Sequence, residues 1–280
     1  MPTRIGIVTD SSSQITDELA ARFDVEVVPM TVTVDDVDHL EGVDLDADGF
    51  YAAFDGGRCP EITTAQPSPG RFADAYARMA ERGYDRVVSV HVSASMSGTI
   101  ASAELAARSA TIPVTVIDSG TASFGVAISV WAAGAAIDRG ASVEDVERRV
   151  RRLVPSIATA FMIGVPHLAE RSGRAAGVDL TDDGIQVLAM VAGRLEVLER
   201  VSTIDDTVDV MSTFAIGHGD GITVAIGTAD APSRPLARRL DRAVAGIDTV
   251  DGVVHYRVGP SVGAHTGPGT FGLFVFPTIR

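Results

Sequence analysis

The chain has 280 residues, enough for one large domain or two smaller ones with a sizeable buried core. Hydrophobic residues make up 46% of the sequence and charged residues 21%, which is typical of a globular protein. With 23 basic and 37 acidic residues the net charge is −14. A chain this acidic is predicted to bind neither nucleic acid nor an anionic membrane surface.

All the basic residues are arginines, because the sequence contains no lysine. This excludes chemistry that needs a lysine amine, such as Schiff bases and the phosphate-binding lysine of nucleotide-binding loops. A single cysteine, Cys59, excludes an intramolecular disulfide, and the histidines lack metal-ligand spacing. No signal peptide is recognisable, and the longest apolar tract, residues 124–137, is shorter than the ~20 residues that span a bilayer. We therefore expect a cytoplasmic protein without stable membrane insertion, metal or cofactor.

Strand and helix patterns alternate over the first half of the sequence. Strands are predicted at residues 4–10, 25–34, 85–93 and 114–118. Helices are predicted at residues 16–23, 69–83, from 98 onward, 123–139 and 142–153. This alternation predicts a parallel sheet flanked by helices.

The pattern changes after Pro155. Two apolar runs flank a Val-Ala-Gly turn and predict a hairpin, and it is followed by a helix, a strand, a helix and two more strands. These elements are predicted at residues 185–190, 194–201, 203–214, 222–227 and 235–245, with the last two strands near the end. The predicted fold class is therefore α/β with two domains. Residues 1–153 form an N-terminal parallel α/β domain, and residues 154–280 form a C-terminal mixed α+β domain.

Two motifs match known binding loops in their letters but not in their context. Residues 44–49 with Asp55 match the spacing of a calcium-binding EF-hand loop, but no helix is predicted before it. We expect instead a short helix capped by Asp46 or Asp48. The G-x-G-x-x-G pattern at residues 267–272 precedes a strand and not a helix, which argues against a dinucleotide site.

Three segments rich in hydroxyls, glycine and proline are candidates for binding an anion: residues 63–70, 93–99 and 265–269. The first two each precede a predicted helix, where hydroxyls and backbone N–H groups meet the positive end of the helix dipole. The third presents a histidine from a glycine-rich turn. Helix capping explains Ser68, and it explains Ser97 as well as anion binding does. The candidate binding side chains are Thr63, Thr64, Ser93, Ser95, Ser97 and His265.

The sequence resembles the DegV family over essentially its whole length. The motifs that carry the resemblance occur in the family's order: VTDSSS, TTAQPSPG, SASMSGTIASA, VIDSGTASFG, LAERSGRAAG and HTGPGTFG. The resemblance implies a two-domain α/β protein that holds one long-chain fatty acid between its domains. It also implies that the protein is not an enzyme itself, but presents the acid to a separate kinase subunit that makes an acyl-phosphate.

The resemblance further implies roles for single residues. Thr64 and Ser97 would donate hydrogen bonds to the fatty-acid carboxylate, with Ser93 or Ser95 nearby. His265 would contact the head group directly or through water. Neutral donors suit a chain of charge −14, whose overall field repels an anion.

Two departures from the family pattern concern these roles. Ala65 stands where the family has a serine, which removes one possible donor to the carboxylate. Arg171 and Arg174 are the candidates for docking a kinase subunit, but the following stretch is acidic at Asp205 and Asp206 where the family is basic. An acidic stretch there is expected to weaken docking of a partner that needs a basic surface.

A long acyl tail needs an apolar tunnel. Burying about 14 methylenes at about 0.8 kcal/mol each gives about 11 kcal/mol, before association costs of about 4–15 kcal/mol. The candidate wall residues are Phe161, Met162, Ile163, Val165, Met190 and Phe271. A different function also remains open: a serine esterase that acts on an acyl substrate through Ser97 and His265, although the first glycine of the G-x-S-x-G motif is missing.

Overall fold

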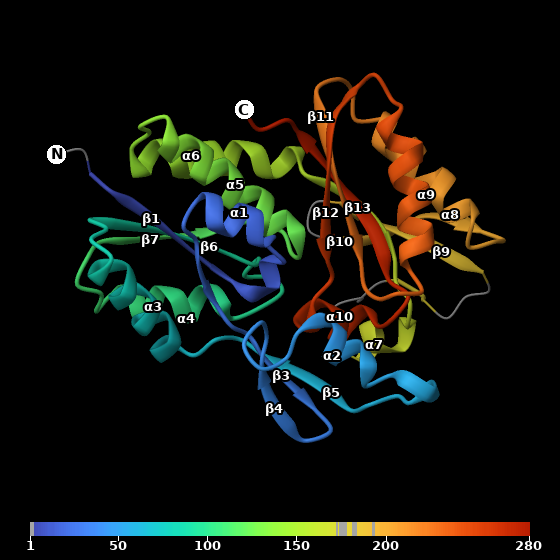
Figure 1. Ribbon diagram of the computed structural model, residues 1–280, viewed down its shortest axis with the longest axis horizontal. Coiled ribbons are helices and arrows are strands. Elements are labelled where there is room, and N and C mark those ends of the chain that lie inside the picture. Colours follow the sequence, from blue (N-terminus) through green and yellow to red (C-terminus); the bar gives the residue numbers. More distant parts are fainter. Residues whose placement is uncertain (1–2, 172, 174–177, 181–183, 192–193) are drawn as a thin grey trace. The chain divides into compact units, whose positions relative to one another are not determined.

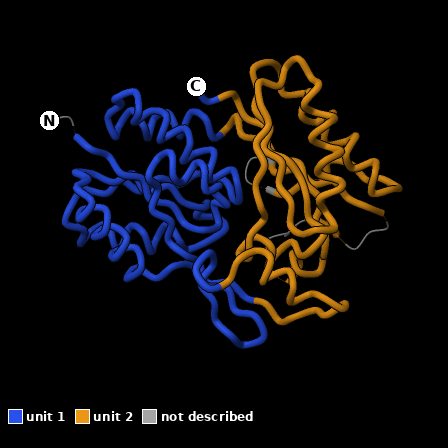
Figure 2. The backbone as a smooth tube through the Cα atoms, in the orientation of Figure 1, with its two compact units in different colours: residues 1–44, 63–154, 279–280 blue, residues 45–62, 155–278 orange. Residues whose placement is uncertain are grey.

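The computed structural model describes residues 3–171, 173, 178–180, 184–191 and 194–280. The chain divides into two compact units (Figure 2). Unit 1 consists of Met1–Asp44, Thr63–Val154 and Ile279–Arg280, and unit 2 consists of Leu45–Ile62 and Pro155–Thr278. The predicted division into residues 1–153 and 154–280 differs from these units chiefly in the segment Leu45–Ile62, which belongs to unit 2.

Unit 1 is built on a parallel sheet with the strand order β2-β1-β6-β7. Helices α3 and α4 cover one face of this sheet, and α5, backed by α6, covers the other (Figure 1). The predicted parallel sheet with flanking helices is therefore confirmed. The strands are β1 (Ile5–Asp10), β2 (Glu26–Val28), β6 (Arg86–His91) and β7 (Val114–Asp118). The helices are α1 (Asp17–Arg22), α3 (Pro69–Glu81), α4 (Thr99–Ala107), α5 (Phe124–Asp138) and α6 (Val143–Leu153), with the short 3-10 helices η1 (Ser11–Ser13) and η3 (Val154–Ser156).

The core of unit 1 follows from the sequence of its helices. One face of α3 places Phe72, Tyr76 and Met79 against Val8 of β1 and Val87 of β6, as its helical spacing predicts. Helix α5 is apolar around its whole circumference, and nearly all of its residues are buried. A helix without a polar face belongs in a core, and here it closes the second face of the sheet.

A second, three-stranded sheet has the order β4-β3-β5. Its strands are β3 (Thr31–Val34), β4 (Val37–Leu40) and β5 (Ile62–Ala65). The single strand predicted at residues 25–34 is wrong, because Pro29, which has no N–H to donate, separates β2 from β3. Within the hydroxyl-rich segment at residues 63–70, Thr63 and Thr64 lie in β5.

Unit 2 contains a mixed sheet with the order β10-β9-β8-β13-β11-β12, in which only β11 and β12 are parallel. Helices α8 and α9 pack against one face (Figure 1). The predicted mixed α+β organisation and the hairpin of β9 and β10 are confirmed. The strands are β8 (Ala158–Met162), β9 (Ile185–Val191), β10 (Arg194–Val201), β11 (Ile222–Thr228), β12 (Val250–Arg257) and β13 (Phe271–Pro277). The helices are α2 (Ala47–Ala52), η2 (Asp55–Gly57), α7 (Pro166–Arg171), α8 (Asp206–Ile216), α9 (Arg234–Ala245) and α10 (Pro260–Thr266).

Helix α2 explains why Leu45–Ile62 belongs to unit 2. Asp46 caps this helix, with its Oδ1 accepting from the Gly49 N–H at 2.7 Å, as predicted. Phe50 and Tyr51 are buried, and the Tyr51 hydroxyl donates to the Val258 carbonyl at 3.0 Å. The segment before α2 is β4 followed by turns, so the motif at residues 44–49 lacks the entering helix of an EF-hand.

The glycine-rich turn predicted around His265 is helix α10, which begins at Pro260 and ends before Gly267. Proline suits the first turn of a helix because its φ is already helical and its missing N–H would have no helical partner. Gly267 has a φ of 74°, a conformation that ends a helix easily when the residue is glycine. No helix in the described part of the chain is long and apolar enough to cross a membrane.

Candidate functional site

The carboxyl ends of β1, β6 and β7 lie next to one another, because these three strands are neighbours in the parallel sheet of unit 1. The segments that leave them are rich in hydroxyls: Ser11–Ser13 after β1, residues 93–99 after β6 and residues 119–123 after β7. Ligands of open parallel sheets bind at such strand ends. This edge of unit 1 is therefore the place to look for a binding site.

Carboxylates from both neighbouring strands hold the segment that follows β6. Asp10, the last residue of β1, accepts a hydrogen bond from the Val92 N–H at 3.3 Å through its Oδ2 atom. Asp118, the last residue of β7, accepts from the Ala94 N–H at 3.2 Å. We call residues 93–98 the serine loop. Val92, just before this loop, and Ala94 within it are each held by a carboxylate, so the hydroxyls are presented by an ordered backbone.

The hydroxyls of the serine loop form two pairs. The Oγ atoms of Ser93 and Ser95 lie 2.9 Å apart, with Ser93 buried and Ser95 exposed. The Oγ of Ser97, which is half-buried, lies 2.8 Å from the Oγ1 of the buried Thr99. In each pair one hydroxyl can donate a hydrogen bond to the other. The accepting hydroxyl can then donate its own proton to a ligand.

The start of α4 differs from the capping prediction. The N-cap of α4 is Gly98, and no side chain makes a capping hydrogen bond there. Of the two explanations left open for Ser97, the N-cap is therefore not the one observed, although its Oγ accepts from the Thr99 N–H at 3.4 Å. A glycine N-cap leaves the first N–H groups of the helix without a side-chain acceptor.

The structure brings the segment around Thr64 next to the serine loop. A Cβ added to Gly98 would lie 2.5 Å from the Nε2 atom of Gln66, so the Gln66 amide lies directly against the Gly98 backbone. Thr63 and Thr64 occupy successive positions of β5, where Thr63 is exposed and Thr64 half-buried. Because successive side chains of a strand point to opposite faces, only one of these two threonines can face a given ligand.

The remaining predicted residues lie in unit 2. His265 is half-buried on α10, near the carboxyl end of that helix. Arg171 is exposed at the end of α7, and Arg174 lies outside the described residues.

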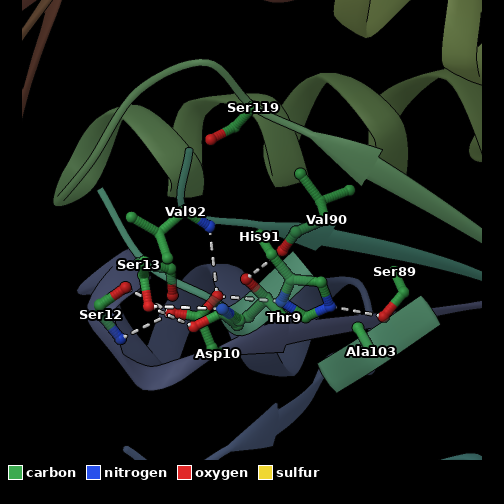
Figure 3. A network of polar contacts seen from close by, with 12 residues as sticks. Thr9, Asp10, Ser12, Ser13, Ser89, Val90, His91, Val92, Ala103 and Ser119 are labelled. Carbon is green, nitrogen blue, oxygen red and sulfur yellow. Dashed lines mark hydrogen bonds and ion pairs between the residues drawn. The ribbon is translucent and has the colours of Figure 1, made fainter. Parts of the chain in front are cut away.

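A buried polar network that the sequence motifs did not indicate lies at the carboxyl ends of β1 and β6 (Figure 3). The Oδ2 of Asp10 is 2.9 Å from the Nδ1 of His91, whose Nε2 is 2.6 Å from the Oγ of Ser89. Ser89 Oγ in turn lies 3.0 Å from the hydroxyl of Tyr76. Asp10 Oδ1 also accepts from the Ser12 N–H at 3.1 Å and from the Ser12 hydroxyl. The network joins β1, β6 and α3.

This network has the composition of a Ser-His-Asp catalytic triad but not its accessibility. Asp10, His91 and Ser89 are all 0% exposed, so no substrate reaches the Ser89 hydroxyl. Tyr76 shares this environment, and burial raises its pKa to about 12 although its hydrogen bond with Ser89 acts in the opposite direction. A sealed and fully hydrogen-bonded chain of this kind orders the strand ends and does not catalyse.

The esterase interpretation gains no support from this geometry. Ser97 Oγ has the hydroxyl and N–H of Thr99 as its partners. Among the described residues of unit 1 no histidine is hydrogen-bonded to Ser97, and a serine nucleophile needs such a base.

Strand alternation sorts the residues predicted to line an acyl tunnel. Met162 and Phe271 belong to the core cluster that unit 2 forms with α8 and α9, so they serve the core. Phe161 and Ile163 pack in a separate cluster with Leu188. Val165 and Met190 are half-buried. The candidates for an apolar binding surface are therefore Phe161, Ile163, Val165 and Met190.

Comparison with known proteins gives a consistent result. A family model described as "Uncharacterised protein, DegV family" matches residues 4–278. A DegV domain-containing protein of Streptomyces coelicolor is 31% identical over 284 residues, which cover 98% of this chain and 99% of the relative. A second relative, from Deinococcus radiodurans, is 29% identical over 287 residues and covers 98% of each chain.

Solved structures share the fold. A structure described as fatty acid binding of a DegV family protein from Thermus thermophilus has a TM-score of 0.87 and 28% identity, covering 99% of this chain and 100% of that one. The structure of DegV from Bacillus subtilis, described as a fatty acid binding protein, has a TM-score of 0.86 with the same coverage. Its identity of 22% supports the fold alone.

Proposed function

The chain belongs to the DegV family, and from this premise we propose that it binds one long-chain fatty acid and is not itself an enzyme. The family predicted from the sequence motifs is thereby confirmed. The relative from Thermus thermophilus, at 28% identity over the whole chain, is described by its fatty acid binding. The observation that carries the proposal in this chain is the close packing of Gln66 on Gly98, which sets the Thr64 segment beside the serine loop.

Hydroxyls and backbone N–H groups supply the carboxylate site in this proposal. Thr64 and Ser97 donate to the carboxylate, with the Ser93–Ser95 pair nearby, and His265 of unit 2 is a further donor to the head group. The lysine-free sequence offers no ammonium group for this task. Hydrogen bonds to a charged acceptor contribute about 1.5–3 kcal/mol each, about twice as much as neutral ones, so a few hydroxyl donors suffice to hold a carboxylate.

The acyl tail is bound by apolar side chains of unit 2 in this proposal. Phe161 and Ile163 lie in the cluster with Ala169, Leu180 and Leu188, apart from the core beneath α8 and α9. Aromatic and branched side chains of this kind supply the large contact area that a long acyl chain needs.

Native mass spectrometry of the purified protein tests the binding itself. We expect a mass increment of one fatty acid per chain, identified by extraction of the lipid. A protein that carries no lipid and takes up none on incubation with palmitate would contradict the proposal.

A double substitution tests the carboxylate site. Thr64→Ala with Ser97→Ala is expected to weaken palmitate binding at least tenfold, because each removed donor costs about 1.5 kcal/mol or more. Thr63→Ala is the matched control, since its side chain lies on the other face of β5. His265→Ala is measured separately. Unchanged palmitate affinity in the double variant would show that the head group binds elsewhere.

The proposal includes presentation of the carboxylate to a partner kinase for acyl-phosphate formation. One of the two charges of the acidic stretch that departs from the family pattern is paired within the chain, which lessens its repulsion of a partner. Asp205 forms an ion pair with Arg239 of α9, and Asp206 accepts a hydrogen bond from the Thr203 N–H at 3.0 Å.

The exposed Arg171 is the docking residue to test. With a fatty acid kinase added, Arg171→Glu is expected to lower acyl-phosphate formation while palmitate affinity stays unchanged. Equal phosphorylation of both proteins would rule Arg171 out as a docking residue.

A further inference from the structure

Gln66 packs against Gly98 in a way that depends on glycine at that position. An added Cβ would lie 2.5 Å from Nε2, 2.7 Å from Oε1 and 2.8 Å from Cδ of Gln66, so the whole amide group lies over the glycine. The backbone at Gly98 has φ −75° and ψ 8°, which any residue adopts without strain. Glycine is therefore required at position 98 because a side chain would displace the Gln66 amide. The backbone conformation there does not require glycine.

The Gln66 amide is held by packing and not by hydrogen bonds. Within the described part of the chain its side chain forms no hydrogen bond, and Gln66 is exposed. A primary amide carries two N–H donors. These donors lie beside Gly98, whose two sequence neighbours are Ser97 and the buried Thr99.

We propose that Gln66 is a further head-group residue, whose Nε2 donates a hydrogen bond to the carboxylate bound beside Ser97. This inference rests on the proposed fatty-acid binding. Hydroxyls both donate and accept, so Thr64 and Ser97 can also accept a hydrogen bond from the hydroxyl of an alcohol. An amide N–H only donates, and its bond to a charged oxygen is worth about twice a neutral one. Gln66 therefore adds preference for the acid.

Gln66→Glu is the decisive variant, because glutamate has nearly the same shape and can lie on Gly98 in the same way. It replaces the donor with a carboxylate that repels the bound one. At pH 8 we expect palmitate affinity to fall at least tenfold. The affinity for hexadecanol, which has the same chain length and no charge, is expected to change less than twofold. The melting temperature is expected to stay within 2 °C of that of the unsubstituted protein.

Gly98→Ala tests the same contact from the other side. Its methyl group displaces the amide, and palmitate affinity is expected to fall about threefold to tenfold while the serine loop keeps its sequence. A Gln66→Glu protein that binds palmitate as the unsubstituted protein does would overturn the inference and leave the proposed function intact. Equal losses for palmitate and hexadecanol would also overturn it, because they indicate a structural role. Failure of the unsubstituted protein to bind palmitate would instead reject the proposed function.

Discussion

The Nδ1 atom of His91 lies 2.9 Å from the Oδ2 atom of Asp10, and neither side chain is exposed to solvent. This pair joins the ends of β1 and β6 at the edge from which the serine loop departs. Asp10 receives further hydrogen bonds from Ser12 and from the Val92 N–H. The pair thus stabilises the edge of the sheet that presents the hydroxyls, and it does so without contacting a ligand.

Removal of one partner from this pair is expected to be costly. His91→Ala leaves the buried Asp10 without its histidine partner, and we expect the free energy of unfolding to fall by about 3–5 kcal/mol. Urea unfolding followed by circular dichroism measures this. Arg151→Ala is the control, because its pair with Glu147 is exposed and is worth less than about 1 kcal/mol. Similar losses in the two variants would contradict a stabilising role for the buried pair.

Tyr76 gives the protein a dependence on alkaline pH. Burial raises its pKa to about 12, whereas an unfolded tyrosine titrates near pH 10. Between these values the unfolded chain has lost a proton that the native chain keeps, so stability that is complete below about pH 10 is lost as the pH rises through about 12. Tyr76→Phe removes this contribution of roughly 2–3 kcal/mol and should flatten the decline.

Urea unfolding at pH 9, 10 and 11 tests the prediction. The sequence has no lysine, so no ammonium side chain titrates over the same range and masks the effect. Parallel declines in the Tyr76→Phe variant and the unsubstituted protein would show that Tyr76 is not responsible.

Asp118 is expected to support ligand binding from a distance. Its carboxylate accepts from the Ala94 N–H at 3.2 Å and from the Gly120 N–H at 2.8 Å. Asp118→Ala frees the start of the serine loop, so palmitate affinity should fall about threefold to tenfold, as expected for the loss of about 1 kcal/mol. Asp74→Ala, an exposed acidic residue on α3, controls for charge. A similar change of palmitate affinity in both variants would instead attribute the effect to the changed net charge of the protein.

Gly164 occupies a position where the chain has no room for a side chain. A Cβ there would lie 1.8 Å from the carbonyl oxygen of Pro268. Gly164→Ala is therefore expected to destabilise the protein by about 3 kcal/mol or more, since backbone must move. Gly246→Ala is the matched control, because nothing lies within 4 Å of its added Cβ. Thermal unfolding of both variants compares them, and an equal melting temperature would show that the Gly164 segment yields easily.

Periodicity predicted most of the fold because most elements bury a face that the sequence alone defines. β7 was predicted with its observed bounds, and the helix predicted at residues 142–153 is α6, which begins one residue later. Glycine was misread around His265, where Gly263 lies inside a helix. There glycine meets a need for space against the Tyr51 ring, which comes from a distant part of the chain.

Only those parts of the candidate site that are marked by the residue types in short motifs could be predicted from the sequence. The hydroxyls of Thr64 and Ser97 stand out in short polar motifs, and Asp10 was visible at a strand end. The network of His91, Ser89 and Tyr76 depends on strand register and helix docking, which local sequence does not specify. The contact of Gln66 with Gly98 likewise joins two segments that a single sequence does not pair.

That residues 45–62 belong to unit 2, although residues 63–154 after them belong to unit 1, has a consequence for synthesis on the ribosome. Helix α2 emerges from the exit tunnel long before β12, yet Tyr51 finds its partner at Val258, 207 residues later. Unit 2 therefore cannot fold until nearly the whole chain has been made, whereas most contacts of unit 1 become available by residue 154. During translation the side chains of Phe50 and Tyr51 therefore lack their native contacts with α10 and Val258 until the end of the chain has been made. A fragment that starts at residue 155 would lack them altogether.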